Sequence, residues 1–149
     1  MRLAGYLWAL PNTLLAIATG LLLLGRFRLV DGVLEITGRR VAWALDHLPN
    51  PAAALTLGHA VFGIDQEALD RTRVHERVHV RQYERWGPLF VPAYLGFSAW
   101  LYARGRDGYL ENPFEVEAYA VDDCRGGAAH VGVQPLGCTL DSRPQQPKG

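Results

Sequence analysis

Hydrophobic residues dominate the first part of the chain, where residues 3–24 contain no charged side chain. As one helix this segment spans about 33 Å, which is long enough to cross a bilayer. Pro11, Asn12 and Thr13 interrupt the apolar run, so a kinked helix or two shorter helices are alternatives. The pattern predicts a transmembrane helix, and a helix buried in the core is the competing interpretation.

The residues that flank this segment bear on its orientation. Only Arg2 precedes it and no small-residue cleavage site follows it, which argues against a cleaved signal peptide. Four arginines follow it at short distance: Arg26, Arg28, Arg39 and Arg40. By the positive-inside rule, these cations predict a membrane-associated protein whose remaining chain lies in the cytoplasm.

Two later stretches have the composition and alternation of β-strands. Residues 26–37 alternate polar and apolar side chains around Asp31-Gly32, which predicts a hairpin with strands at 26–30 and 33–37. Residues 54–62, with the sequence A-L-T-L-G-H-A-V-F, predict a single strand that ends at Gly63.

A helix is predicted to start at the N-cap Asp65 and to end at Trp86, before the pair Gly87-Pro88. One of its faces carries polar and aromatic side chains, namely His75, His79, Gln82, Tyr83 and Trp86. The opposite face is charged and carries Arg73, Arg77, Arg81 and Glu84. A helix with these two faces is suited to lining a metal site.

Two further helices complete the pattern. Residues 89–103 are uncharged but short for a membrane span, so they predict a core helix or a membrane-surface hairpin. A last helix is predicted to start at the N-cap Asn112, with Pro113 at its first position and Glu115 completing a capping box.

These elements together predict an α+β fold. We divide the chain into a hydrophobic N-terminal segment (1–25), one folded domain (26–125) and a loop-rich, partly disordered tail (126–149) that is rich in Gly, Pro and Gln.

Composition narrows the range of functions. Lys+Arg and Asp+Glu each number 15, so the net charge is zero, and no basic excess points to a nucleic-acid partner. The two cysteines, Cys124 and Cys138, are too few for a cysteine-based zinc site. They can form one disulfide, but free thiols in a reducing compartment are the favoured interpretation.

The strongest functional signal is the H-E-x-x-H motif at residues 75–79. On a helix, His75 and His79 are spaced i and i+4, so both rings project from one face and can share a metal ion. Glu76 lies about a hundred degrees round the helix from His75, within reach of a water on that metal. The motif predicts a zinc site with Glu76 as general base.

A catalytic zinc site needs a third protein ligand beside an open position for water. Arg85 stands where the metzincin pattern has its third histidine, so a downstream glutamate is required, and Glu115 and Glu117 are the candidates. Glu117 shares a helix face with the apolar Phe114, Ala120, Val121 and Cys124, whereas the capping box already uses Glu115. Helical geometry therefore favours Glu117, with Glu115 as the alternative.

The motif His75-Glu76-x-x-His79-x-x-Gln82, followed by a helix with Glu-x-x-Ala, resembles the gluzincin metallopeptidases and small bacterial membrane-associated H-E-x-x-H proteins near them. The resemblance covers roughly residues 54–124. It implies a compact zincin-like domain with an active-site helix, a second helix that bears the third ligand, and a few short antiparallel strands. It also implies that the strand beside the active-site helix holds an extended substrate. The aspartate that follows Glu-x-x-Ala in membrane-bound relatives is replaced here by Tyr119 or Val121.

The expected function is thus a zinc-dependent metallopeptidase that acts on a peptide or protein substrate. Zn²⁺ on the histidine pair and the third glutamate activates a water, and Glu76 takes its proton and passes it to the leaving amine. The candidates for an oxyanion donor or a supporting group are Tyr83, Tyr119 and His59. The alternative is a non-catalytic zinc-binding or scaffold protein at the membrane, with His130 or Cys124 as a fourth ligand.

Overall fold

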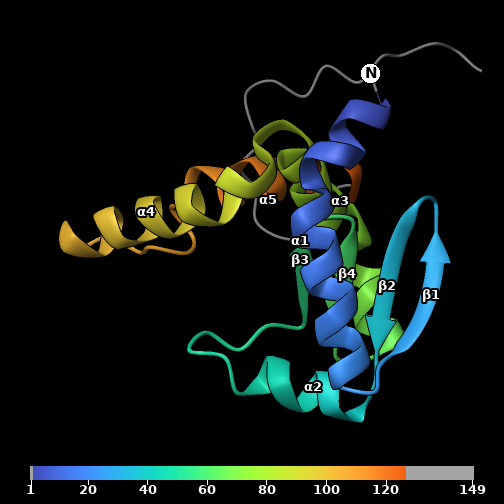
Figure 1. Ribbon diagram of the computed structural model, residues 1–149. Helices are drawn as coiled ribbons and strands as arrows, with labels where there is room; N and C mark the ends of the chain where they lie inside the picture. The colour runs from blue at the N-terminus through green and yellow to red at the C-terminus, as the bar shows by residue number, and fades with distance from the viewer. Residues whose placement is uncertain (1, 127–149) are drawn as a thin grey trace, which may run out of the picture.

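The structure is a computed structural model that describes residues 2–126, and it combines helices with one sheet (Figure 1). In chain order its elements are α1 (Arg2–Leu22), β1 (Arg26–Val30), β2 (Val33–Thr37), α2 (Arg39–Asp46), β3 (Ala54–Leu57), β4 (Ala60–Gly63), α3 (Gln66–Trp86), the 3₁₀ helix η1 (Gly87–Leu89), α4 (Phe90–Ala103) and α5 (Pro113–Gly126). The α+β class expected from the sequence is therefore confirmed. The tail predicted at 126–149 lies, from residue 127 on, outside the described residues.

The hairpin predicted around Asp31-Gly32 is confirmed with the same strand limits, but the strand predicted at 54–62 is wrong. Residues Gly58 and His59 form a turn, and β3 and β4 on either side of it pair antiparallel, with Leu57 opposite Ala60. Gly58 adopts φ +65°, a left-handed conformation that glycine reaches without a steric penalty. This glycine turns one apolar run into two strands.

The sheet has the strand order β1-β2-β4-β3. The prediction that all of its strands are antiparallel is wrong for the central pair. β2 and β4 run parallel, with Leu34 beside Ala60 and Thr37 beside Gly63. Parallel neighbours need a crossover connection, which α2 and β3 supply here. As a result β3, which follows α2 in the chain, lies at an edge of the sheet.

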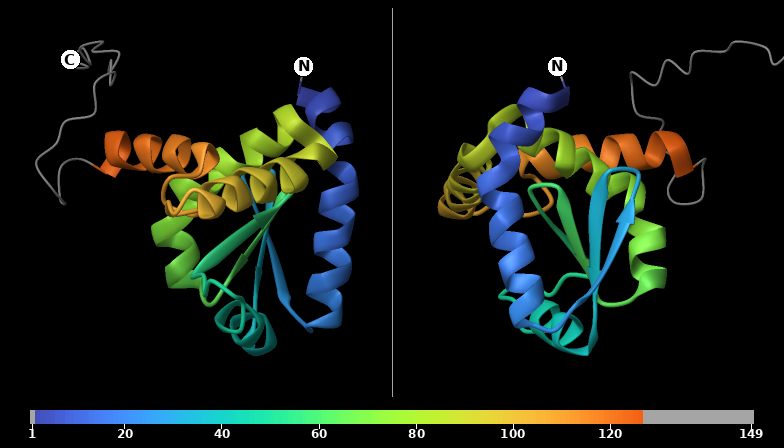
Figure 2. Two further views of the ribbon diagram at one scale, coloured as in Figure 1. Left: turned by 90° about the vertical axis from the view of Figure 1, so that its left-hand side faces the viewer. Right: turned by 45° about the vertical axis from the view of Figure 1, so that its right-hand side comes forward.

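Helices cover both faces of this sheet, as Figure 2 shows with α1 on one side and α3 on the other. Successive side chains of a strand point to opposite faces. Ile36 accordingly packs with Ala16 of α1, and Val33 packs with Leu69 of α3. Both faces of β2 are covered, and the face toward α3 also buries Glu35, which pairs with Arg73 of that helix.

The N-terminal segment forms a single helix that continues through Pro11, so the alternative of two shorter helices is wrong. Its stretch Gly5–Leu22 is long and apolar enough to cross a membrane, judged by length and composition. One side of α1 packs on the domain, and Ala9 and Ala16 are fully buried there. The other side is exposed and carries leucines, so α1 has one face on the protein and one face free.

α4 is one continuous helix rather than a hairpin, and most of it lies outside the core. Only Phe90 and Leu101 are buried in it. In Figure 1 the helix projects from the rest of the fold toward the left. A helix at 89–103 is therefore confirmed, but it is not a hairpin and most of it is not in the core; the predicted location at a membrane surface stays a prediction.

The docking of α1 on the β3–β4 turn can be tested at Gly58. A Cβ at this position would meet the Oγ1 of Thr13 at 2.4 Å and its backbone nitrogen at 2.6 Å. We expect Gly58→Ala to lower the free energy of unfolding by about 3 kcal/mol, because overpacking adds to backbone strain. Urea denaturation followed by circular dichroism measures this loss.

Gly105 provides the matched control, because its φ is +69° and a Cβ there would meet nothing within 4 Å. Gly105→Ala should lose only the strain of a left-handed residue, about 1 kcal/mol. Equal losses for the two substitutions would contradict the packing of α1 against this turn.

Candidate metal centre

The inner face of α3 presents the two histidines of the H-E-x-x-H motif. Asp65 caps the helix, as predicted, by accepting a hydrogen bond of 2.7 Å from the backbone N–H of Ala68. One turn separates His75 from His79, and both are buried, with 8% of each residue exposed. Their Nε2 atoms lie 3.2 Å apart, so both rings direct the same nitrogen to one point.

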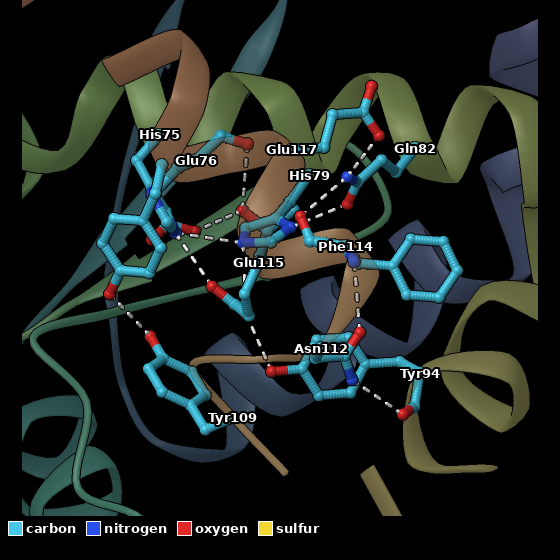
Figure 3. Close-up of polar contacts among 12 residues, drawn as sticks. His75, Glu76, His79, Gln82, Tyr94, Tyr109, Asn112, Phe114, Glu115 and Glu117 are labelled. Carbon is cyan, nitrogen blue, oxygen red and sulfur yellow. Dashed lines mark hydrogen bonds and ion pairs between the residues drawn. The ribbon is translucent and has the colours of Figure 1, made fainter. Parts of the chain in front are cut away.

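α5 brings a carboxylate to the same point (Figure 3). The Oε2 of Glu115 lies 3.3 Å from the Nε2 of His75, and its Oε1 lies 3.5 Å from the Nε2 of His79. The start of α5 is held by Asn112, whose Oδ1 accepts from the N–H of Phe114 and whose Nδ2 donates to the carbonyl of Tyr94 on α4. This cap places Glu115 in the first turn of α5, against α3.

The spacing of these three side chains is that of a metal site. Ligand atoms about 2.0–2.1 Å from a tetrahedral zinc ion lie about 3.3 Å from one another. The Oε2 of Glu115 is also buried without a hydrogen-bond partner, which is costly for a carboxylate unless a cation compensates it. The buried group His75, His79 and Glu115 can therefore hold a metal ion.

Electrostatics in the site favour a cation. Burial pushes the pKa of Glu115 upward, but the neighbouring His75 and His79 outweigh it and bring the value to about 2. Burial likewise lowers the pKa of His79, yet the neighbouring Glu115 raises it above its ordinary value. The carboxylate is thus ionised and attracts positive charge to the two rings.

A buried glutamine orients one of the rings. The Nδ1 of His79 lies 2.9 Å from the Oε1 of Gln82, which is fully buried. An amide oxygen can only accept, so Nδ1 carries the proton and the lone pair of Nε2 faces Glu115. The amide nitrogen of Gln82 donates to the carbonyl of Phe114 and to Glu117, which ties the ring to α5. Outer hydrogen bonds of this kind are usual for metal-bound histidines.

Glu76 lies beside the three ligands and contacts the edge strand. Its Oε2 accepts a hydrogen bond of 2.6 Å from the hydroxyl of Thr56 on β3. Burial is the main cause that raises the pKa of Glu76, while the nearby His79 opposes this. A carboxylate with a raised pKa is a better proton acceptor than an exposed one.

The preference for Glu117 over Glu115 as third ligand is corrected by this arrangement. The side chain of Glu117 is 39% exposed and pairs with Arg85 at 2.9 Å. The buried face of α5 runs through Phe114, Glu115 and Ala118, and not through Ala120 and Val121. The predicted capping box is also absent from the hydrogen bonds of the described residues, because the N–H of Asn112 donates to the carbonyl of Tyr109.

Of the three residues considered as oxyanion donors or supporting groups, only Tyr119 lies at the site. Its ring contacts His75 with centroids 4.6 Å apart, and its hydroxyl lies 3.4 Å from that of Tyr109. Tyr83 packs in the core with Ala9, Phe90 and Phe114. His59 lies in the β3–β4 turn, where its Nε2 is 3.0 Å from Glu84. The positions of Tyr83 and His59 thus do not support the roles considered for them.

Three polar groups around the site are not among the residues predicted from the sequence. Tyr94 on α4 donates a hydrogen bond of 2.7 Å to the Oε1 of Glu115, Thr56 donates to Glu76, and Tyr109 approaches Tyr119. The signal for Thr56 was a lone hydroxyl in an apolar strand beside the motif. Tyr94 and Tyr109 carried no comparable signal, since aromatic residues are frequent throughout their segments. The fourth ligands considered, His130 and the Cys124 side chain, lie outside the described residues.

Comparisons of this chain with protein families, with characterised proteins and with solved structures found no match.

Substituting the two glutamates of α5 separately tests the ligand set. We expect Glu115→Gln to lower zinc affinity by at least about tenfold, because the carboxylate charge between His75 and His79 is lost. Glu117→Gln should keep its affinity close to that of the wild type, since Glu117 lies outside the triad. Isothermal titration with Zn²⁺ on purified protein measures both, and the reverse order of effects would restore Glu117 as the ligand.

Proposed function

We propose that this protein is a zinc-dependent metallopeptidase that uses Glu76 as general base. The observation that carries the proposal is the position of Glu76, which lies next to the buried group of His75, His79 and Glu115. Three protein ligands leave a fourth zinc position open, as hydrolytic sites require. A site that only binds metal has no need of a carboxylate beside that position.

The residues divide the chemistry between them. A zinc ion, when bound, supplies a Lewis acid that lowers the pKa of water and polarises a carbonyl. Glu76 accepts the proton of the attacking water and returns it to the leaving amine. Thr56 donates a hydrogen bond to one oxygen of Glu76 and so restrains the side chain of the base. Tyr119 and Tyr109 are candidate donors to the oxyanion, because the Tyr119 ring lies against His75 and its hydroxyl is close to that of Tyr109.

The sheet offers a place for a peptide substrate. β3 is an edge strand, packs against α3 and supplies Thr56 to Glu76. An extended peptide can pair with a free edge through backbone hydrogen bonds, which align it without reading its sequence. The gluzincin-like motif pattern of the chain supports the same arrangement. We therefore propose a polypeptide substrate bound along β3.

We also propose that this domain lies on the cytoplasmic side of a membrane. α1 has the length and composition of a membrane helix. The arginines that follow it are Arg26, Arg28, Arg39 and Arg40. Positive residues next to a membrane helix favour the cytoplasmic side.

A second candidate function is metal binding without catalysis. It is favoured by the enclosure of the site, since His75, His79 and Glu115 are each less than 10% exposed. The ring of Tyr119 lies against His75 and adds to this enclosure. A scaffold whose fold is stabilised by zinc needs no such access.

Glu76→Gln distinguishes the two functions. We expect zinc content to stay near that of the wild type and hydrolysis to fall by about 10²–10⁴-fold, because proton transfer is lost while the ligands remain. Metal content by mass spectrometry and cleavage of a quenched fluorescent peptide library measure the two effects. His75→Ala is the control and should lose both zinc and hydrolysis. A wild type that binds zinc but cleaves nothing in the library would favour the non-catalytic function.

A further inference from the structure

α4 is an uncharged helix whose apolar side chains are exposed on several sides. Its 14 residues include no Asp, Glu, Lys or Arg. Four large side chains are between 41% and 62% exposed: Leu95, Phe97, Trp100 and Tyr102. Leu89, just before the helix, is 59% exposed. A helix that is apolar all round belongs in a protein core or in lipid, and α4 is not in the core.

We propose that α4 inserts into one leaflet of a lipid bilayer and docks this protein on the membrane. A helix of this length extends about 21 Å, which is too short to cross the hydrocarbon layer of about 30 Å. Its backbone hydrogen bonds are internal, so the helix can enter lipid without leaving polar groups unpaired. The partner is therefore a membrane surface into which α4 is partly immersed.

The charges at the end of α4 match a phospholipid surface. Arg104 follows the helix directly, and its guanidinium lies 4.3 Å from the ring centroid of Trp100. Among the side chains of residues 5–122 no ion pair joins Arg104 to a carboxylate, whereas Arg106 pairs with Glu111. A tryptophan with an arginine above it is suited to the headgroup layer, where the ring meets hydrocarbon and the cation meets phosphate.

The apolar surface of α4 adjoins that of α1. Both helices contact η1, which carries the exposed Leu89. α1 has the composition of a membrane helix, and its free side exposes Leu7, Leu10 and Leu14. The two helices thus form neighbouring apolar surfaces that meet at η1. The opposite side of α1 packs on the sheet. The helix can therefore contact lipid with its free side while it remains packed in the fold.

Docking of α4 would place the metal centre beside the membrane. The inner side of α4 carries Tyr94, whose hydroxyl donates to Glu115, while Asn112 binds the Tyr94 carbonyl and the hydroxyl of Ser98. One face of the helix thus holds a ligand and the other meets lipid. The identity of the substrate rests on the proposed hydrolysis. If that function holds, the substrate class is a polypeptide attached to the same membrane.

The test measures binding of the full chain to vesicles of phosphatidylcholine and phosphatidylglycerol by flotation. We expect the double variant Leu95→Glu/Phe97→Glu to have a vesicle affinity roughly a hundredfold lower than that of the wild type. Each new carboxylate would have to enter lipid, which opposes insertion of the helix. The matched control is Leu29→Glu/Trp43→Glu, which adds the same charge at exposed apolar positions of β1 and α2, away from α4 in Figure 1. The control should bind as the wild type does.

The outcomes separate the possible occupants of this surface. Equal vesicle binding by the double variant and the wild type would overturn the proposal and leave α1 as the membrane contact. A wild type that ignores vesicles but self-associates, together with a monomeric double variant, would assign α4 to a second copy and also overturn it. Circular dichroism and urea denaturation check that both variants fold. None of these measurements depends on metal or on hydrolysis.

Quenching by brominated acyl chains gives a second, site-specific measurement. We expect Trp100→Phe to reduce the fraction of vesicle-bound tryptophan fluorescence that is quenched, because Trp100 is in lipid. Trp43→Phe, which removes a still more exposed ring from α2, should not reduce that fraction. An unchanged quenched fraction in Trp100→Phe would contradict insertion of α4.

Discussion

A buried carboxylate between two buried histidines is the constraint on which the arrangement of helices depends. Glu115 is ionised in a place that water barely reaches, and such a charge is costly unless nearby groups compensate it. His75 and His79 on α3, together with the Tyr94 hydroxyl on α4, provide that compensation. Three helices are therefore held around one point, and a metal ion on the triad would tighten the same contacts.

Apolar packing beneath the site keeps these polar groups in register. Tyr83, Phe90 and Phe114, from α3, α4 and α5, form a cluster with Ala9 of α1. Because this cluster is close-packed, a shift of one helix would displace the others. On the side of the sheet, Thr56 binds Glu76 and so connects the base to β3. The candidate ligands and the candidate base are thus positioned by different layers of the fold.

The surface of the molecule carries two helices with exposed apolar side chains. α1 and α4 each use one side to pack on the domain and expose apolar side chains on the rest. Exposed apolar area of this extent is unusual for a soluble monomer and suits a protein that works at a membrane. The neutral net charge of the chain does not oppose this, and Arg104 places a cation against the exposed ring of Trp100.

The sequence by itself determined what depends on near neighbours in the chain. The cap at Asp65, the pairing of His75 with His79 one turn apart, and the hairpin around Asp31-Gly32 are all set by local geometry. Only the tertiary structure decided that Glu115, and not Glu117, meets the histidines, because the rotation of α5 is set by its packing on α3 and α4 rather than by its own apolar pattern. The parallel pairing of β2 with β4 could not be predicted from the sequence either, because α2 and β3 separate these two strands in the chain.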